Sequence, residues 1–322
     1  MKKILFLILS MIMLCLISGC SINGPSLTGD TIKIIDDNNR TVQLKKTPKR
    51  VVVLSPSFLE LIEAVDGTVV GRAKTQLGTV PDFAKDAVEV GYIFNINVEK
   101  IIELRPDVVI AYKGMHERYL PTLESNNIPS VVLRLKSYDD VKHSLIKLGK
   151  IMNNEDKGKK AAAKLDADIQ KTVSTLPKSN RSVAIIHTTN MGITMEKDSS
   201  IAGCCAKLLH LRNIVKNNTV PVAGPMGTQP DMAPYSLEHL VEINPDIIFI
   251  TSMGEKKDIE GKLQSEIMRN EAWNSIAAVK NNQVFFLPDE LFLLNPGLRY
   301  PQAVRLMASK LYPDIIKEEV NE

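Results

Sequence analysis

Residues 98–110 read Val-Glu-Lys-Ile-Ile-Glu-Leu-Arg-Pro-Asp-Val-Val-Ile, and residues 237–249 read Leu-Glu-His-Leu-Val-Glu-Ile-Asn-Pro-Asp-Ile-Ile-Phe. Each copy predicts a helix, then a Pro-Asp turn, then a buried strand. A single unit of this kind is common in α/β proteins, but two copies, one in each half of the chain, indicate an internal duplication. The repeat therefore predicts two equivalent α/β lobes.

Short β-branched runs alternate with amphipathic helical patterns on both sides of each copy. Residues 50–54 predict a strand that leads through Ser55-Pro56-Ser57 into a helical pattern ending at Asp66-Gly67. Further strands are predicted at residues 69–71, 108–111, 130–133 and 182–186. Strands that alternate with helices imply a parallel sheet covered on both faces. We therefore expect an α/β fold of two Rossmann-like lobes, each a parallel sheet flanked by helices.

The composition changes between residues 138 and 177, where no strand pattern occurs and apolar positions recur at helical spacing. One or two long helices are expected here, and about 25 residues of continuous helix would span roughly 38 Å, enough to bridge two lobes. The predicted domains are an N-terminal lobe at 31–137, an inter-lobe helix at 138–177 and a C-terminal lobe at 181–316. A bridging helix predicts a small hinge movement and a ligand cleft between the lobes.

The N-terminus has the pattern of a cleavable export signal. Lys2 and Lys3 precede a largely apolar run at residues 4–17, which is shorter than the roughly 20 residues needed to span a bilayer. The run ends in Leu16-Ile17-Ser18-Gly19-Cys20, which resembles the bacterial lipobox. The resemblance implies a signal peptide at 1–19, acylation of Cys20 and a tether at 20–30, at the outer face of the cell membrane. The alternative is an ordinary secretory signal in which Cys20 is incidental.

Composition excludes several classes of function. The formal net charge is +3 with both signs interspersed, so nothing indicates a nucleic-acid partner. No second long apolar run follows the signal, which predicts a mature chain that is soluble apart from its anchor. Five histidines without a His-x-His pattern argue against a zinc or manganese carrier. No GxSxG, P-loop, HExxH or GxGxxG pattern follows a strand, so no enzyme is predicted.

The adjacent pair Cys204-Cys205 leaves three readings open, namely a vicinal disulfide, a soft-metal site or simple packing. Packing is favoured because two residues alone make an incomplete metal site. A redox or metal-handling lipoprotein enzyme that uses this pair is the distant alternative for the function.

Ligands of open parallel sheets bind outside the carboxyl ends of the strands, so the pocket is expected where the strand ends of the two lobes face each other. This rule selects a set of mainly aromatic, soft or hydroxyl-bearing side chains: Ser55, Ser57, Tyr92, Phe94, Tyr112, Lys113, Met115, His187, Thr188, Met232, Tyr235, Ser252 and Met253. Such a wall suits a large, flat or greasy metal chelate better than an amino acid or a sugar. If the chelate is haem, the candidate iron ligands are Tyr112, Met115, His187, Met232 and Met253. Arg299 would either meet a ligand carboxylate or pair locally.

In this order the motifs resemble the substrate-binding proteins of ABC importers for iron-siderophore, haem and vitamin B12, over residues 31–312. The marks are the strand at 50–54 with Ser55-Pro56-Ser57 and Glu60, then Gly91, then the two Pro-Asp copies. The resemblance implies that Glu99 and Glu238 dock onto arginines of a dimeric permease with its cytoplasmic ATPase. It also implies that the protein is a monomer, has no intrinsic cofactor and carries a ferric siderophore or haem.

The same fold with a corrinoid cargo such as cobalamin is the alternative. The only tryptophan, Trp273, is expected in a surface helix, which argues mildly against this cargo because corrinoid pockets of the family are rich in tryptophan. Two departures from the family pattern leave the cargo open. Leu209-His210-Leu211-Arg212 replaces the usual Gly-Gly before Asn213-Ile214, and Cys204-Cys205 is expected at a helix start near the pocket.

Overall fold

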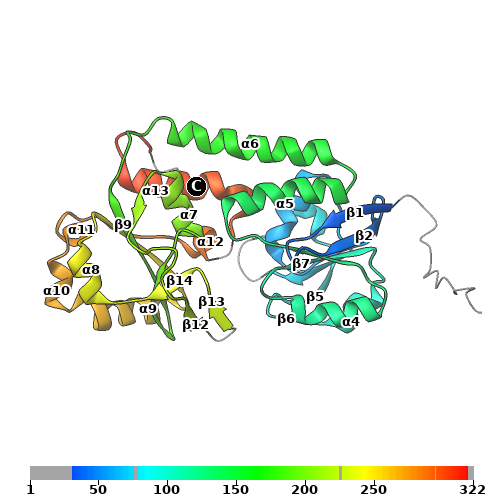
Figure 1. Ribbon diagram of the computed structural model, residues 1–322, viewed down its shortest axis with the longest axis horizontal. Helices are drawn as coiled ribbons and strands as arrows, with labels where there is room; N and C mark the ends of the chain where they lie inside the picture. The colour runs from blue at the N-terminus through cyan, green and yellow to red at the C-terminus, as the bar shows by residue number, and fades with distance from the viewer. Residues whose placement is uncertain (1–30, 76–78, 225–226, 294, 318–322) are drawn as a thin grey trace, which may run out of the picture.

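The structure, a computed structural model, describes residues 31–75, 79–224, 227–293 and 295–317. The predicted signal peptide, the tether and Cys20 lie outside these residues. Within the described part, no helix is both long enough and apolar enough to cross a membrane. Figure 1 shows two lobes side by side, with a long helix lying across both of them.

The N-terminal lobe is built on a six-stranded sheet in the order β6-β5-β4-β3-β7-β8, parallel except for β6. The strands of this sheet are β3 (Val51–Val53), β4 (Gly71–Lys74), β5 (Val88–Tyr92), β6 (Asn95–Ile96), β7 (Val108–Tyr112) and β8 (Ser130–Leu133). The hairpin and helices are β1 (Thr31–Ile35), β2 (Thr41–Lys45), η2 (Pro56–Phe58), α2 (Leu59–Ala64), η3 (Asp82–Ala84), α3 (Val98–Glu103), η4 (Glu117–Tyr119) and α4 (Leu120–Ser125).

The C-terminal lobe has a second sheet in the order β14-β10-β9-β15-β16, with β11 also paired to β9. The strands of this lobe are β9 (Ser182–Thr189), β10 (Gly192–Glu196), β11 (Arg212–Asn213), β12 (Val222–Gly224), β13 (Gly227–Gln229), β14 (Met232–Pro234), β15 (Ile247–Met253) and β16 (Val284–Phe286). The helices are α7 (Ile201–Leu208), α8 (Leu237–Ile243), α9 (Lys256–Leu263), η5 (Gln264–Met268), α10 (Glu271–Asn274), α11 (Ala277–Lys280), α12 (Asp289–Phe292), η6 (Gly297–Arg299) and α13 (Tyr300–Leu311).

The predicted α/β class is confirmed, but the second sheet is mixed rather than purely parallel. Strand β10 runs antiparallel to both β9 and β14. The reason is local: Thr189 pairs with Gly192, so the chain reverses through a two-residue turn instead of a helical crossover. The Thr189 hydroxyl also accepts a hydrogen bond from the N–H of Met191, at 3.1 Å, which stabilises the turn.

The two Pro-Asp repeats adopt matching structures. Asp107 accepts hydrogen bonds from the N–H groups of Lys49 and Arg50, at 2.9 and 3.0 Å, where strand β3 begins. Asp246 likewise accepts from the N–H and hydroxyl of Ser182, both at 2.7 Å, where strand β9 begins. Each Asp therefore ties its own strand, β7 or β15, to the neighbouring parallel strand. The duplication seen in the sequence is a duplication of this strand-to-strand connection.

The segment expected as one or two helices is a pair, α5 (Tyr138–Ile151) and α6 (Glu155–Val173). Ser137 caps α5 in a reciprocal capping box with Asp140. Helix α6 has 19 residues, about 28 Å at 1.5 Å per residue, and packs against both α5 and α13. Only α6 lies across both lobes, above α5 on one side and α13 on the other (Figure 1).

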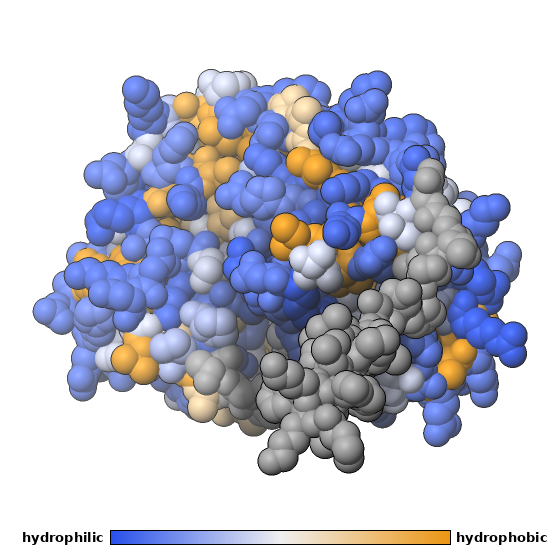
Figure 2. All heavy atoms as spheres, turned by 45° about the vertical axis from the view of Figure 1, so that its right-hand side comes forward, coloured by the Kyte–Doolittle hydropathy of each residue, from blue (hydrophilic) through white to orange (hydrophobic). Residues whose placement is uncertain are grey.

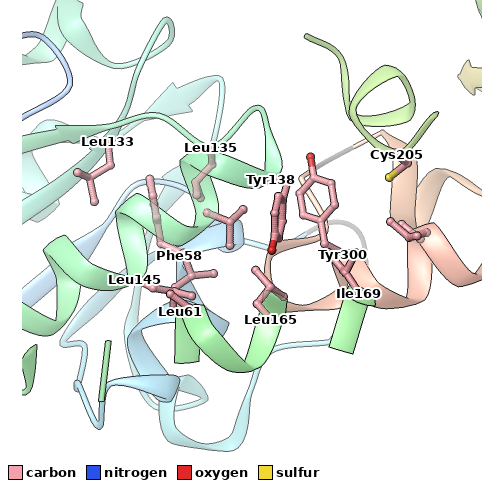
Figure 3. Packing of buried hydrophobic residues seen from close by; sticks show 14 of the residues in the cluster. Phe58, Leu61, Leu133, Leu135, Tyr138, Leu145, Leu165, Ile169, Cys205 and Tyr300 are labelled. Carbon is pink, nitrogen blue, oxygen red and sulfur yellow. The ribbon is translucent and has the colours of Figure 1, made fainter. Parts of the chain in front are cut away.

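One buried apolar cluster joins the lobes. It contains Val51 and Val108 of the first sheet, Ile185 of the second, and Leu165 and Ile169 of α6. On the outside, hydrophilic residues predominate on the face that Figure 2 shows, with hydrophobic residues in small patches between them. Inside, Figure 3 shows Tyr138 of α5 between Phe58 of the N-terminal lobe and Tyr300 of the C-terminal lobe, with Leu165 and Ile169 of α6 beside them. Each sheet has a separate cluster on its other face. The lobes therefore share one core, which opposes wide opening between them.

Candidate functional site: a cavity between the lobes

A cavity of about 190 Å³ lies where the two lobes meet. The first lobe contributes residues that follow strands β3, β5 and β7, and the second contributes residues of β9 and β10 and the start of α7. The predicted site residues that line it are Ser55, Ser57, Tyr112, Met115, His187 and Met232. The other residues that line this cavity were not predicted from the sequence and are Ile93, Leu135, Lys136, Glu196, Ser199, Ser200, Ile201, Asp231, Phe292, Leu293 and Asn295.

A second cavity of about 270 Å³ adjoins the first and shares Ser57 and Asn295 with it. Arg299 lines this outer cavity, and its Nε lies 3.4 Å from Oε1 of Glu60. Burial raises the pKa of Glu60, and the neighbouring Arg299 opposes this shift. Arg299 thus pairs locally with Glu60 and lines the cavity at the same time.

The predicted residue Tyr112 is part of the wall rather than a free ligand. It is buried, and its hydroxyl donates a 2.8 Å hydrogen bond to the carbonyl of Leu135. Burial raises the pKa of this phenol well above its ordinary value of 10.0, so the side chain stays neutral near pH 7. A phenolate that binds iron would have to lose both the proton and this hydrogen bond.

His116 supports the same wall from behind. Its Nδ1 accepts a 3.0 Å hydrogen bond from the N–H of Tyr112, and its Nε2 lies 2.8 Å from the carbonyl oxygen of Ile93. Both ring nitrogens are therefore occupied by the backbone. Burial lowers the pKa of His116, in agreement with a neutral imidazole in the protein interior.

On the opposite wall, three neighbouring strands bring His187, Thr251 and Glu196 together. His187 and Thr251 are register partners on β9 and β15, and His187 Nδ1 lies 2.8 Å from the Thr251 hydroxyl oxygen. That hydroxyl in turn donates to Oε1 of the buried Glu196 on β10. A Glu at a buried position at the end of an apolar strand was the sequence signal that could have revealed Glu196.

Charged and polar groups line the rest of the cavity. Lys136 of the N-terminal lobe forms an ion pair with Asp231 of the C-terminal lobe. Helix α7 begins at the cavity with Ser199, Ser200 and Ile201, so its partially positive N-terminal end faces the cavity. The close approach of α7 to the backbone of Lys197 depends on Gly203, because a Cβ there would lie 2.0 Å from the carbonyl oxygen of Lys197.

Seven predicted site residues are not among the described residues that line either cavity. Tyr92, Phe94 and Met253 lie on the surface, with 41%, 45% and 46% of their areas exposed. Tyr235 packs against the apolar cluster on the other face of the second sheet, and burial raises its pKa to about 12. Thr188 is buried without a hydrogen-bond partner, Lys113 donates to the carbonyl of Asp37, and Ser252 donates to Asp289 at 2.9 Å.

The cysteine pair lies in the middle of α7 rather than at its start. Both thiols are free, and Cys204 Sγ accepts a 3.4 Å hydrogen bond from the N–H of Tyr138. Burial raises the pKa of Cys204 to about 12 and raises that of Cys205 as well. Thiolates are therefore scarce near neutral pH, and the pair packs in the shared core. Among the residues described, no group of three or more His, Cys, Asp or Glu side chains is arranged to hold a metal ion.

Glu99 and Glu238 occupy equivalent places in the two lobes. Each is the second residue of its helix, α3 or α8, and each is exposed. Asn97 and Ser236 cap these helices by accepting the N–H groups of Lys100 and His239. No ion pair engages either Glu within the described ranges, so both carboxylates face solvent.

Two lobes with a shared core, a bridging helix and a polar cavity between them define a binding protein of the two-lobed, helix-bridged class. The sequence profile of the family described as "Periplasmic binding protein" matches residues 51–291. The chain belongs to this family.

Individual relatives agree with this assignment. The chain is 30% identical over 261 residues to the Fe(3+)-citrate-binding protein YfmC of Bacillus subtilis, covering 79% of this chain and 77% of that one. It is 26% identical to the uncharacterized ABC transporter substrate-binding lipoprotein YvrC of the same organism, covering 89% and 87%. The structure of Staphylococcus aureus IsdE complexed with heme superimposes with a TM-score of 0.68 at 22% identity, covering 84% of this chain and 99% of that one.

Proposed function

We propose that the protein is the substrate-binding component of an ABC importer and that it carries an iron chelate to its permease. The observation that carries this proposal is the family match over residues 51–291 together with a donor-lined cavity between the lobes. The relative YfmC is named for ferric citrate, and the IsdE structure contains heme. Iron chelates are therefore the cargo class that these similarities favour, and a corrinoid becomes an arm of the binding test.

We further propose that Cys20 carries the lipid anchor and that the protein acts as a monomer at the outer face of the membrane. The lipobox-like Leu16-Ile17-Ser18-Gly19-Cys20 supports the anchor, as does the similarity to a substrate-binding lipoprotein. Two acyl chains give stable anchoring, whereas one chain is marginal. In this account the chain binds and releases its cargo and catalyses no reaction.

Permease docking is assigned to Glu99 and Glu238. Their equivalent places in the two lobes suit a partner with two-fold symmetry, and carboxylates can form bidentate, register-fixing contacts with arginine. Both side chains are exposed and lie on helix starts away from the cavity. The docking contacts and the binding contacts are thus made by different residues.

The experiment measures uptake of ⁵⁵Fe-labelled ferric citrate by cells that carry Glu99→Lys or Glu238→Lys in place of the wild-type chain. We expect transport to fall at least tenfold while the affinity of the purified proteins changes less than twofold. Glu103→Lys and Glu242→Lys are matched controls, because these exposed acids occupy equivalent positions later in the same two helices. Loss of affinity, or equal loss of uptake in the controls, would contradict the assignment.

A further inference from the structure

The environment of His187 fixes which of its nitrogens can bind a ligand. The Glu196 carboxylate can only accept hydrogen bonds, so the Thr251 hydroxyl donates its proton to it. The Thr251 oxygen must then accept from His187, whose Nδ1 lies 2.8 Å away. Nδ1 therefore carries a proton, and in the neutral imidazole the lone pair is on Nε2. Histidines that bind metals typically donate their other ring N–H to an acceptor that fixes the orientation of the ring. For His187 this acceptor is the Thr251 hydroxyl, which is itself oriented by the Glu196 carboxylate.

His187 lines the cavity, and its side chain retains 14% of its exposed area. Nε2 has no hydrogen-bond partner within the described ranges, whereas both nitrogens of His116, the other histidine at this site, are occupied. Glu196 also lines the cavity, but its Oε1 is engaged by Thr251 and its side chain is only 4% exposed.

Two further polar groups in the cavity are buried without partners. The Ser55 hydroxyl and the Asn295 side-chain amide nitrogen are inaccessible and unpaired, in residues that are 0% and 6% exposed. The Asn295 oxygen accepts the N–H of Gly297 at 2.8 Å, which leaves the amide nitrogen as a donor. Unpaired buried donors are costly, so they favour a ligand that brings acceptor oxygens. The N-terminal end of α7 favours negative charge at the same place.

We propose that His187 is a direct ligand of the cargo metal, and that the cargo is a compact, carboxylate-bearing ferric chelate with an open coordination position. A single neutral imidazole supplies one coordination bond, so the chelator provides the remaining ones. Ser55, Asn295 and the start of α7 hold oxygens of the chelator. The inner cavity of about 190 Å³ and the adjoining cavity of about 270 Å³ together fall in the lower half of the roughly 300–1,000 Å³ of typical ligand sites, which favours a small chelator.

This inference rests on the proposed function, and its test uses ferric citrate and ferrioxamine B as probes. Ferrioxamine B surrounds its iron completely, so it offers no position for His187. Iron K-edge absorption of wild-type protein loaded with ferric citrate should contain the multiple scattering of one imidazole. His187→Ala should lose that signal and bind ferric citrate about 10- to 100-fold more weakly. Any binding of ferrioxamine B should be unchanged by the same substitution.

Thr251→Val isolates the orienting hydrogen bonds, because it keeps the shape of the side chain and removes the hydroxyl. We expect it to weaken ferric citrate binding about tenfold while the imidazole signal persists at lower occupancy. Thr188→Val is the matched control, since Thr188 is equally buried on β9 and its hydroxyl has no partner. Its affinity should stay within twofold of wild type.

Four results would overturn the inference. Wild-type protein that binds ferric citrate through oxygen ligands alone would refute it and leave the proposed function intact. The same holds if His187→Ala binds ferric citrate as tightly as wild type, or if wild type binds ferrioxamine B and not ferric citrate. Wild-type protein that binds no ferric chelate would refute the inference and the proposed function together.

Discussion

The core shared by the two lobes makes a quantitative prediction for Leu165. This side chain lies near the middle of α6, is only 3% exposed and belongs to the cluster that joins both sheets. Leu165→Ala removes three buried carbon atoms and leaves a cavity, which lowers the free energy of unfolding by about 3 kcal/mol. Because α6 contacts both lobes, we expect this loss to appear equally in each lobe.

Urea unfolding with one probe in each lobe measures this effect. Trp273 is the only tryptophan and is buried in the C-terminal lobe, so its fluorescence reports on that lobe alone. Hydrogen exchange of peptides that contain β3 and β7 reports on the N-terminal lobe. Both probes should give one coincident transition, shifted by the same amount in Leu165→Ala. Lys160→Ala, an exposed change on the same helix, should stay within about 0.5 kcal/mol of wild type.

Separate transitions for the two lobes in the wild-type protein would refute this reasoning. A shift of only one probe in Leu165→Ala would do so as well, because it would mean that α6 belongs energetically to one lobe. Either result would also remove the physical basis for a small hinge movement.

Three further outcomes are expected. Burial opposes ionisation of Asp107 and Asp246, but the hydrogen bonds that they accept lower the pKa of both carboxyl groups below the ordinary 3.8. The two carboxylates therefore stabilise the fold above about pH 3.8, and this stabilisation is lost as the pH falls through their folded-state pKa values. In the variant that carries both Asp107→Asn and Asp246→Asn, the loss of stability with falling pH, followed by circular dichroism, should therefore be less steep than in wild type. Equal steepness would contradict the reasoning. Arg105 has a left-handed φ of 44°, so Arg105→Gly should raise the free energy of unfolding by about 0.5–1 kcal/mol in urea titrations; a loss of stability would count against strain there. The raised pKa of Cys204 predicts that iodoacetamide labels the native protein at pH 8 at least tenfold more slowly than the urea-unfolded chain, and comparable rates would show an accessible thiol.

The sequence alone was sufficient for the α/β class and for the duplicated strand-to-strand connection. Both depend on local periodicity and on the Pro-Asp turn, which act within about a dozen residues. The mixed order of the second sheet was missed because the short turn at Asn190-Met191 carries no strong hairpin residue pair. Trp273 was expected at the surface and is instead 4% exposed, because α10 turns its short apolar face towards the second sheet.

Part of the candidate site followed from the rule that ligands bind beyond the carboxyl ends of parallel strands. The rule brought Ser55, Tyr112 and His187 to one cavity, because they lie at the ends of β3, β7 and β9. It failed for Tyr92, because the next residue, Ile93, lines the cavity and successive side chains at a strand end point in opposite directions, which leaves Tyr92 41% exposed. It could not find Glu196, because β10 is antiparallel and the rule does not apply to it. Partners such as Asn295 come from loops, whose positions depend on the packed fold.

The claim that the protein carries an iron chelate is tested most directly by equilibrium dialysis of the mature protein against ⁵⁵Fe-labelled ferric citrate, ferric siderophores and haem, with cobalamin as the competing cargo. We expect saturable binding of at least one iron chelate, with one chelate per chain and a Kd of about 1 µM or tighter, which corresponds to a binding free energy of roughly −8 kcal/mol. Saturable binding of cobalamin alone, or of none of these ligands, would contradict it.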